Sequence, residues 1–226
     1  MIELIVAIVV IGITFMSVPL IMSETERSVE TSVHQEAVMA GLSQMVNIMS
    51  YKWDENQTDE SLNGGYAKVL DTFYTNPLQC REISGTRMRI GHFQEDYRRK
   101  CYNEERNATA PANLGSDGGD MDDIDDINYK YASLLSGTDN NESDYKQNYN
   151  IKISVVYVED DLSNGNDYTP INIIGTVSTT SVTTEPTSIK MIETTISSDT
   201  SDTKVVMRSF AANVGEVRYF SKRVGP

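Results

Sequence analysis

The chain has 226 residues and a formal net charge of −14, from 33 acidic and 19 basic residues. This length fits one ordinary domain, or one domain with an appendage. A chain this acidic lacks the positive surface that neutralises nucleic-acid phosphates. No nucleic-acid partner is therefore expected. Two cysteines and two histidines nearly exclude a Cys/His zinc site.

The N-terminus carries an apolar run, Leu4–Met22, in which 19 residues contain no charge. As a helix it would span roughly 28 Å, the thickness of a bilayer core. Two plainer interpretations are a buried helix of a soluble protein and a secretory signal peptide, although the latter lacks a basic stretch before it and a small-residue cleavage site after it. The carboxylate of Glu3 lies at the start of the run, where transfer to the bilayer centre would cost roughly 2.5–3.5 kcal/mol.

The segment MIELIVAIVVIGI resembles the N-terminus of type IV pilins and type II secretion pseudopilins. The resemblance covers about 25 residues. It implies that a prepilin peptidase removes a short basic leader, that the new N-terminus is methylated, and that pilus assembly machinery takes the subunit from the inner membrane. The family's acid lies at the fifth mature position, so the position of Glu3 predicts that two mature residues precede this sequence.

The resemblance also implies assembly roles for three residues. Glu3 would pair with the N-terminal ammonium of a neighbouring subunit, so that both charges leave solvent together; a residue that merely lies at the membrane interface is the simpler alternative. Gly12 and Pro19 would weaken the helix, as in family filaments where this segment loses helicity, or would only kink it. With Phe15 as the single aromatic residue before Tyr51, a conducting aromatic stack is not expected.

Residues 23–54 continue the helical pattern on one face only. The apolar positions that recur at spacings of three and four are Val29, Val33, Ala37, Val38, Leu42, Met45, Met49 and Trp53. The sequence therefore predicts one helix from Met1 to about Asp54, with a membrane or filament-core part (1–22) and an amphipathic part (23–54).

Residues 55–226 are expected to form a globular head. Residues 66–74 are predicted as a short helix or strand, and residues 150–160, 171–179, 187–197, 204–212 and 215–223 as β-branched strands bounded by turn formers. Short connections favour an antiparallel sheet, covered by the amphipathic helix. The predicted class is α+β. Cys80 and Cys101 are expected to form a disulfide, as in exported proteins; two free thiols would be the alternative, without a CxxC spacing.

The strongest local charge feature is an acidic segment with six aspartates within ten residues. Such density needs a cation or backbone donors to offset repulsion. It predicts either a calcium site or an acidic capping turn, because the spacing is not that of an EF-hand. The DDIDDIN string also resembles, more weakly, pilin-like proteins of the mannose-sensitive haemagglutinin pilus cluster. The six residues are Asp117, Asp120, Asp122, Asp123, Asp125 and Asp126.

Three Asn-x-Ser/Thr sequons begin at Asn56, Asn107 and Asn141, each with an acid two residues earlier. This pattern resembles the acceptor consensus of bacterial periplasmic oligosaccharyltransferases. The sequons predict N-glycans on the head, with unmodified polar loops as the alternative.

No nucleophile elbow, phosphate loop, zinc-protease motif or triad is found, so an enzyme is not expected and no cofactor beyond calcium is implied. The predicted function is a structural pilin that forms a homopolymer, located in an extracellular filament and anchored in the inner membrane before assembly. A minor pilin or pseudopilin that primes or caps a secretion or pilus machine is the second interpretation. A membrane-anchored adhesion module that never polymerises is the third.

Overall fold

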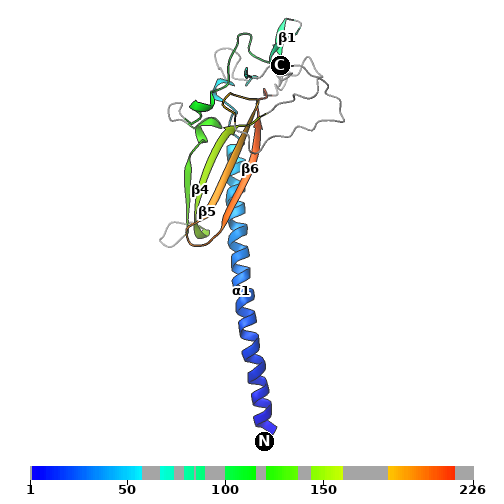
Figure 1. Cartoon of the computed structure of the whole chain (residues 1–226), viewed down its shortest axis with the longest axis vertical. Helices are drawn as coiled ribbons and strands as arrows, with labels where there is room; N and C mark the ends of the chain where they lie inside the picture. Colours follow the sequence, from blue (N-terminus) through cyan, green and yellow to red (C-terminus); the bar gives the residue numbers. More distant parts are fainter. Residues whose placement is uncertain are drawn as a thin grey trace, which may run out of the picture.

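A computed structural model of the chain describes residues 2–57, 67–73, 79–83, 85–89, 100–115, 121–136, 144–159 and 183–216. One long helix, α1 (Ile2–Ile48), runs out of the head as a bare rod, and its upper part lies along an antiparallel sheet (Figure 1). The predicted α+β class is confirmed. The predicted strand 171–179 lies outside the described residues. So do residues 217–223 of the predicted strand 215–223, whose first two residues are not in a strand.

Helix α1 is continuous through Gly12 and Pro19, so the single chain shows no loss of helicity there. It ends at Ile48, six residues before the predicted end at Asp54, and that boundary was wrong. After Ile48 the chain tightens into i→i−3 hydrogen bonds from Ser50 N to Asn47 O and from Tyr51 N to Ile48 O. Trp53 then turns toward the sheet, where its Nε1 donates to Ala211 O at 3.1 Å.

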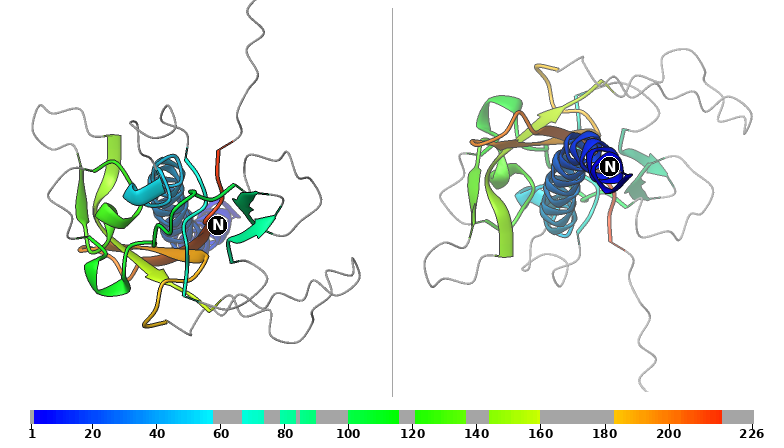
Figure 2. Two further views of the ribbon diagram at one scale, coloured as in Figure 1. Left: turned by 90° about the horizontal axis from the view of Figure 1, so that it is seen from above. Right: turned by 90° about the horizontal axis from the view of Figure 1, so that it is seen from below.

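The main sheet has the order β3-β4-β5-β6, with all neighbours antiparallel. Its strands are β3 (Tyr131–Ser136), β4 (Asp144–Tyr157), β5 (Ile189–Ser198) and β6 (Lys204–Ala212). Three of them match predicted strands, whereas β3 was not predicted because YASLLS is short and lies among turn formers. The helix crosses the face of β4, β5 and β6, as the views along the rod show (Figure 2).

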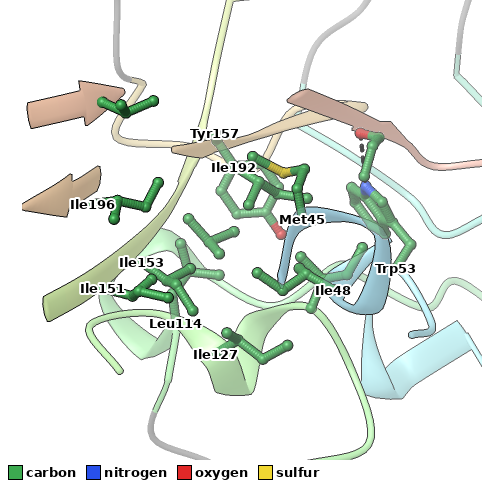
Figure 3. Close-up of a cluster of buried hydrophobic side chains, with 14 of the residues drawn as sticks. Met45, Ile48, Trp53, Leu114, Ile127, Ile151, Ile153, Tyr157, Ile192 and Ile196 are labelled. Carbon is green, nitrogen blue, oxygen red and sulfur yellow. Dashed lines mark hydrogen bonds between the residues drawn. The ribbon is translucent and has the colours of Figure 1, made fainter. Parts of the chain in front are cut away.

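Burial of one sheet face holds the helix in place. Ile192 lies opposite Val155, and Ile196 opposite Ile151, so alternate residues of β4 and β5 form one apolar surface. The helix buries Val33, Ala37, Ala40, Gly41, Met45 and Ile48 against this surface, part of which Figure 3 shows. The predicted stripe is only partly right, since Val29, Leu42 and Met49 are exposed. The buried residues follow the true helical period of 3.6, which rotates these three away from the sheet.

The upper head is built from short segments. A hairpin of β1 (Arg81–Ile83) and β2 (Thr86–Met88) and three 3₁₀ turns, η1 (Glu55–Gln57), η3 (Pro111–Asn113) and η4 (Asp125–Ile127), lie here. Residues 67–73 form neither of the predicted elements; Val69 and Asp71 make isolated parallel bridges to Cys101 and Asn107. The predicted disulfide is present, joining Cys80 to Cys101 with Cα atoms 6.1 Å apart.

Candidate functional site

The lower half of α1 is the first candidate site, an apolar surface that no residue in the described part of the chain covers. Every described residue from Ile2 to Thr31 is exposed, and Val33 is the first buried position. Fully burying a large aliphatic side chain typically contributes about 1.5–3 kcal/mol, so this rod is unfavourable in water. By length and composition the helix is able to cross a membrane, which suggests membrane anchoring or a signal sequence.

The hydroxyl groups of Thr14 and Ser17 in this half are hydrogen-bonded within the helix, so they leave the surface largely apolar. The hydroxyl of Thr14 donates back to Val10 O at 2.8 Å, and that of Ser17 to Thr14 O at 3.0 Å. These bonds satisfy the hydroxyls within the helix itself. Glu3 lies in the first turn, where the helix dipole stabilises a negative charge, so its position alone does not require an external partner. Glu3 is exposed together with the surrounding apolar residues.

The exposed surface continues to the foot of the head as a groove of about 470 Å³. Helix residues Ile21, Met22 and Val29 form one wall. Gln147, Ser201 and Thr203, from β4 and the β5–β6 connection, form the other. The groove is open to solvent and carries an apolar stripe at the point where rod and head meet.

A second candidate site is the buried charge cluster at the top of the helix, formed by Lys190, Asp54, Asp123 and Asp125. Lys190 lies on the core face of β5, in register with Tyr157 of β4. Its side chain is 0% exposed, and its Nζ lies 3.9 Å from the centroid of the Trp53 ring and 5.2 Å from that of Tyr157. Nζ also donates to Trp53 O at 2.8 Å. Two aromatic rings therefore lie beside a cation, a favourable arrangement when the cation is desolvated.

Two carboxylates supply the opposite charge. Nζ of Lys190 lies 2.5 Å from Asp125 Oδ1 and 3.1 Å from Asp54 Oδ2. Asp54 is held firmly, because it also accepts hydrogen bonds from Asn56 N, Thr109 N and the Thr109 hydroxyl. Among the described residues, neither oxygen of Asp125 accepts a hydrogen bond, so its ion contact with Lys190 is its main polar partner. Removing one partner of such a buried pair is strongly destabilising.

Burial changes the proton affinities in this charge cluster. Desolvation raises the pKa of the Asp125 carboxyl to about 8; the charge of Lys190 opposes this shift, and the charges of Asp54 and Asp123 add to it. Desolvation also raises the pKa of Asp123 to about 6, against a backbone hydrogen bond from Asp126. Burial therefore favours the protonated form of Asp125, while the neighbouring lysine favours the ionised form.

The acidic segment folds around its own backbone donors. Asp123 Oδ1 accepts from the N–H groups of Asp125 and Asp126, and Asp126 Oδ2 accepts from those of Asp122 and Asp123. Asp122 is half-exposed and pairs with Lys52 at 3.9 Å. This arrangement has the geometry of the capping turn expected from the sequence. Asp117 and Asp120 lie outside the described residues.

The sequence predicted a cation site formed by the aspartates of this segment alone. The structure instead brings two of them together with Asp54. Oxygen atoms of Asp54, Asp123 and Asp125 lie within 4.8 Å of one another, a spacing that a hard cation such as calcium accepts. The ammonium of Lys190 already supplies positive charge to two of the three. Sequence reasoning missed Lys190 and Asp54. The available signal was a lysine at 190 in phase with Ile192 and Ile196 on the apolar face of its strand.

The predicted glycan acceptors differ in environment. Asn107 is exposed, whereas Asn56 is half-buried in η1 and its Nδ2 donates to the Thr109 hydroxyl at 3.4 Å. The acid two residues before Asn56 is the buried Asp54. Asn141 lies outside the described residues. Glycosylation stays a prediction, with Asn107 the better-placed of the two described acceptors.

Comparisons of the chain with protein-family models, curated proteins and solved structures found no match. The class of protein is therefore defined by architecture alone: a long apolar N-terminal helix packed on a C-terminal antiparallel sheet, which is a pilin-like arrangement.

Proposed function

We propose that this chain is the structural subunit of an extracellular type IV pilus-like filament, assembled by helix packing from an inner-membrane pool. The observation that carries the proposal is the division of α1 at Val33. From this residue upward the helix buries a stripe under its own sheet. From Ile2 to Thr31 every residue is exposed, and most are apolar. A helix with a bare lower half can pass from lipid to contacts with copies of itself without leaving apolar surroundings.

Glu3 is proposed to guide this transfer. In lipid or among apolar helices an unpaired carboxylate is costly, and a positive group from the next subunit would offset that cost. The N-terminal ammonium of a neighbouring copy has the required charge and lies at the same end of the rod. Pairing would set the axial offset between subunits, since only one stagger brings the two groups together.

The experiment is expression in cells that carry a pilus assembly apparatus, followed by shearing and electron microscopy of the surface fraction. Wild type is expected to give long filaments. Glu3→Ala is expected to remain in the membrane fraction without filaments, and Glu3→Asp, the matched variant that keeps the charge, to restore part of the assembly. Long filaments from Glu3→Ala would contradict the role of Glu3.

The wild-type result also separates the other functions expected from the sequence. Short, scarce periplasmic assemblies would identify a minor pilin or pseudopilin. A membrane protein that stays monomeric after detergent extraction, with no surface fibres, would identify an anchored adhesion module. Either outcome would overturn the structural-pilin proposal.

A further inference from the structure

Lys190 and Asp125 are placed for a covalent reaction as well as for an ion pair. Both side chains are buried, at 0% and 3% exposed, and Nζ lies 2.5 Å from Asp125 Oδ1. The carboxyl carbon is one C–O bond of about 1.2 Å further, so Nζ lies within about 3.7 Å of it at most. Reacting atoms held at roughly 3–3.5 Å are in the range of a near-attack arrangement.

We propose that Nζ of Lys190 and the carboxyl group of Asp125 condense to an amide, an isopeptide bond that joins β5 covalently to the acidic segment at η4. The bond would lie at the top of the core, beside the rings of Trp53 and Tyr157. It goes beyond the filament proposal and does not depend on it, since it concerns the head alone.

The neighbouring carboxylates provide the proton transfers. Asp54 Oδ2, 3.1 Å from Nζ, accepts a proton from the ammonium and frees the nitrogen lone pair. The amine attacks the carboxyl carbon of protonated Asp125, a C–N bond forms, and the nitrogen gives up a second proton. One C–O bond breaks, and the hydroxyl takes that proton and leaves as water. One amide, one water and one proton on Asp54 result, and nothing is oxidised or reduced.

Asp123 is placed to relay the second proton. One of its oxygens accepts two backbone hydrogen bonds, while the other is buried and accepts none from the described residues. One oxygen of Asp123 belongs to the group of three acids whose oxygens lie within 4.8 Å of one another. Burial raises the pKa of Asp125, which favours the protonated, electrophilic form of this carboxyl group.

The surroundings favour condensation over hydrolysis. Asp54 and Asp123 are 0% exposed, and the rings of Trp53 and Tyr157 cover the lysine, so the water released has little access back to the bond. Condensation also removes a buried charge, whose desolvation is costly. Fixed placement of the two groups supplies the effective concentration that free amine and acid lack in water.

The test is mass spectrometry of the full chain, extracted in detergent, denatured and reduced. Trypsin should fail to cleave after Lys190, and peptide 153–204 should be recovered linked to peptide 107–130, with the pair lighter by one water than the two peptides separately. Lys190→Arg should regain that water in intact mass, beyond the substitution itself. Lys204→Arg, an exposed lysine at the start of β6, is the matched control that should keep the deficit.

Any glycan adds the same mass to wild type and to the variants, so it cancels when their intact masses are compared. A wild-type chain of full mass that trypsin cleaves after Lys190 would overturn the proposal without any variant. A link to peptide 53–68 would place the bond on Asp54 and would overturn the assignment to Asp125.

Discussion

A Cβ atom at Gly41 of α1 would lie 2.5 Å from Cδ1 of Ile196 on β5. It would also lie 2.8 Å from Sδ of Met207 on β6. Real Cβ contacts are not this short, so glycine allows the helix to approach the sheet at this point. The separation of helix and sheet is therefore set by a residue that has no side chain.

Enlarging this position should push the two layers apart. Gly41→Leu is expected to destabilise the head by about 1–3 kcal/mol or more, because overpacking forces Ile196 and Met207 from their positions. Denaturant unfolding followed by the fluorescence of Trp53, the single tryptophan, measures the effect. Gly12→Ala is the control: nothing lies within 4 Å of its added Cβ, so the head's midpoint should not move. Equal losses in both variants would contradict this contact.

Loss of the Cys80–Cys101 bond should weaken the upper head. The bond closes a loop with a sequence separation of 21, for which chain entropy gives about 3 kcal/mol. Cys101 is buried, so the double change Cys80→Ala/Cys101→Ala is preferred to serine, which would bury a hydroxyl group. The melting temperature should fall, and reductant should lower that of wild type but not that of the double variant. An unchanged wild-type midpoint in reductant would show that the bond adds no stability.

The stability conferred by Asp123 should depend on pH. Its folded-state pKa of about 6 lies above the model-compound value of 3.8, so the folded chain binds this proton more tightly than the unfolded chain does. The contribution is fully present below about pH 4 and is lost as pH rises through 6. Burial is the largest cause of the raised pKa of Asp123, and Asp123 would stay buried if Asp125 formed the isopeptide bond.

The measurement for Asp123 is the difference in unfolding free energy between wild type and Asp123→Asn. This difference should decline by on the order of 2 kcal/mol from pH 4 to pH 7. Asp122→Asn, at a half-exposed position in the same segment, is the matched control. A difference that rises with pH over this range would contradict the raised pKa.

Removing residues 1–20 should leave the head folded. No described residue before Val33 is buried, and the groove at the foot of the head begins at Ile21. The truncated chain is expected to stay in solution without detergent and to melt within about 2 °C of the full chain in detergent. A truncated chain that is unfolded in circular dichroism would show that the rod contributes to the stability of the head.

The rod and the sheet could be predicted because each rests on a periodic pattern. The uncharged run at Leu4–Met22 and the β-branched strands near 153, 192 and 206 are local signals, and the structure has both elements. The end of the helix could not be predicted, since it depends on Trp53 reaching Ala211, which lies 158 residues away in the sequence.

The charge cluster was also beyond local patterns. Asp54, Asp125 and Lys190 come from three distant segments, and each alone resembles an ordinary surface charge. The acidic segment is recognisable in the sequence by its density of aspartates. Only three of its described aspartates are buried, and the sequence does not show which. Their burial follows from the parallel bridge between Lys52 and Asp123, which docks the segment beside the end of the helix.

The upper third of the rod lies lengthwise against β4, β5 and β6 (Figure 1). Beyond its last turn, Trp53 is hydrogen-bonded to Ala211 and Asp54 is paired with Lys190. Tension applied along the rod therefore loads the contact between helix and sheet in shear. Many side-chain contacts resist such a load together, and none breaks before the others. In a filament of such subunits, the α1 rods would transmit the force along the axis. The acidic heads would follow the rods without bearing this load.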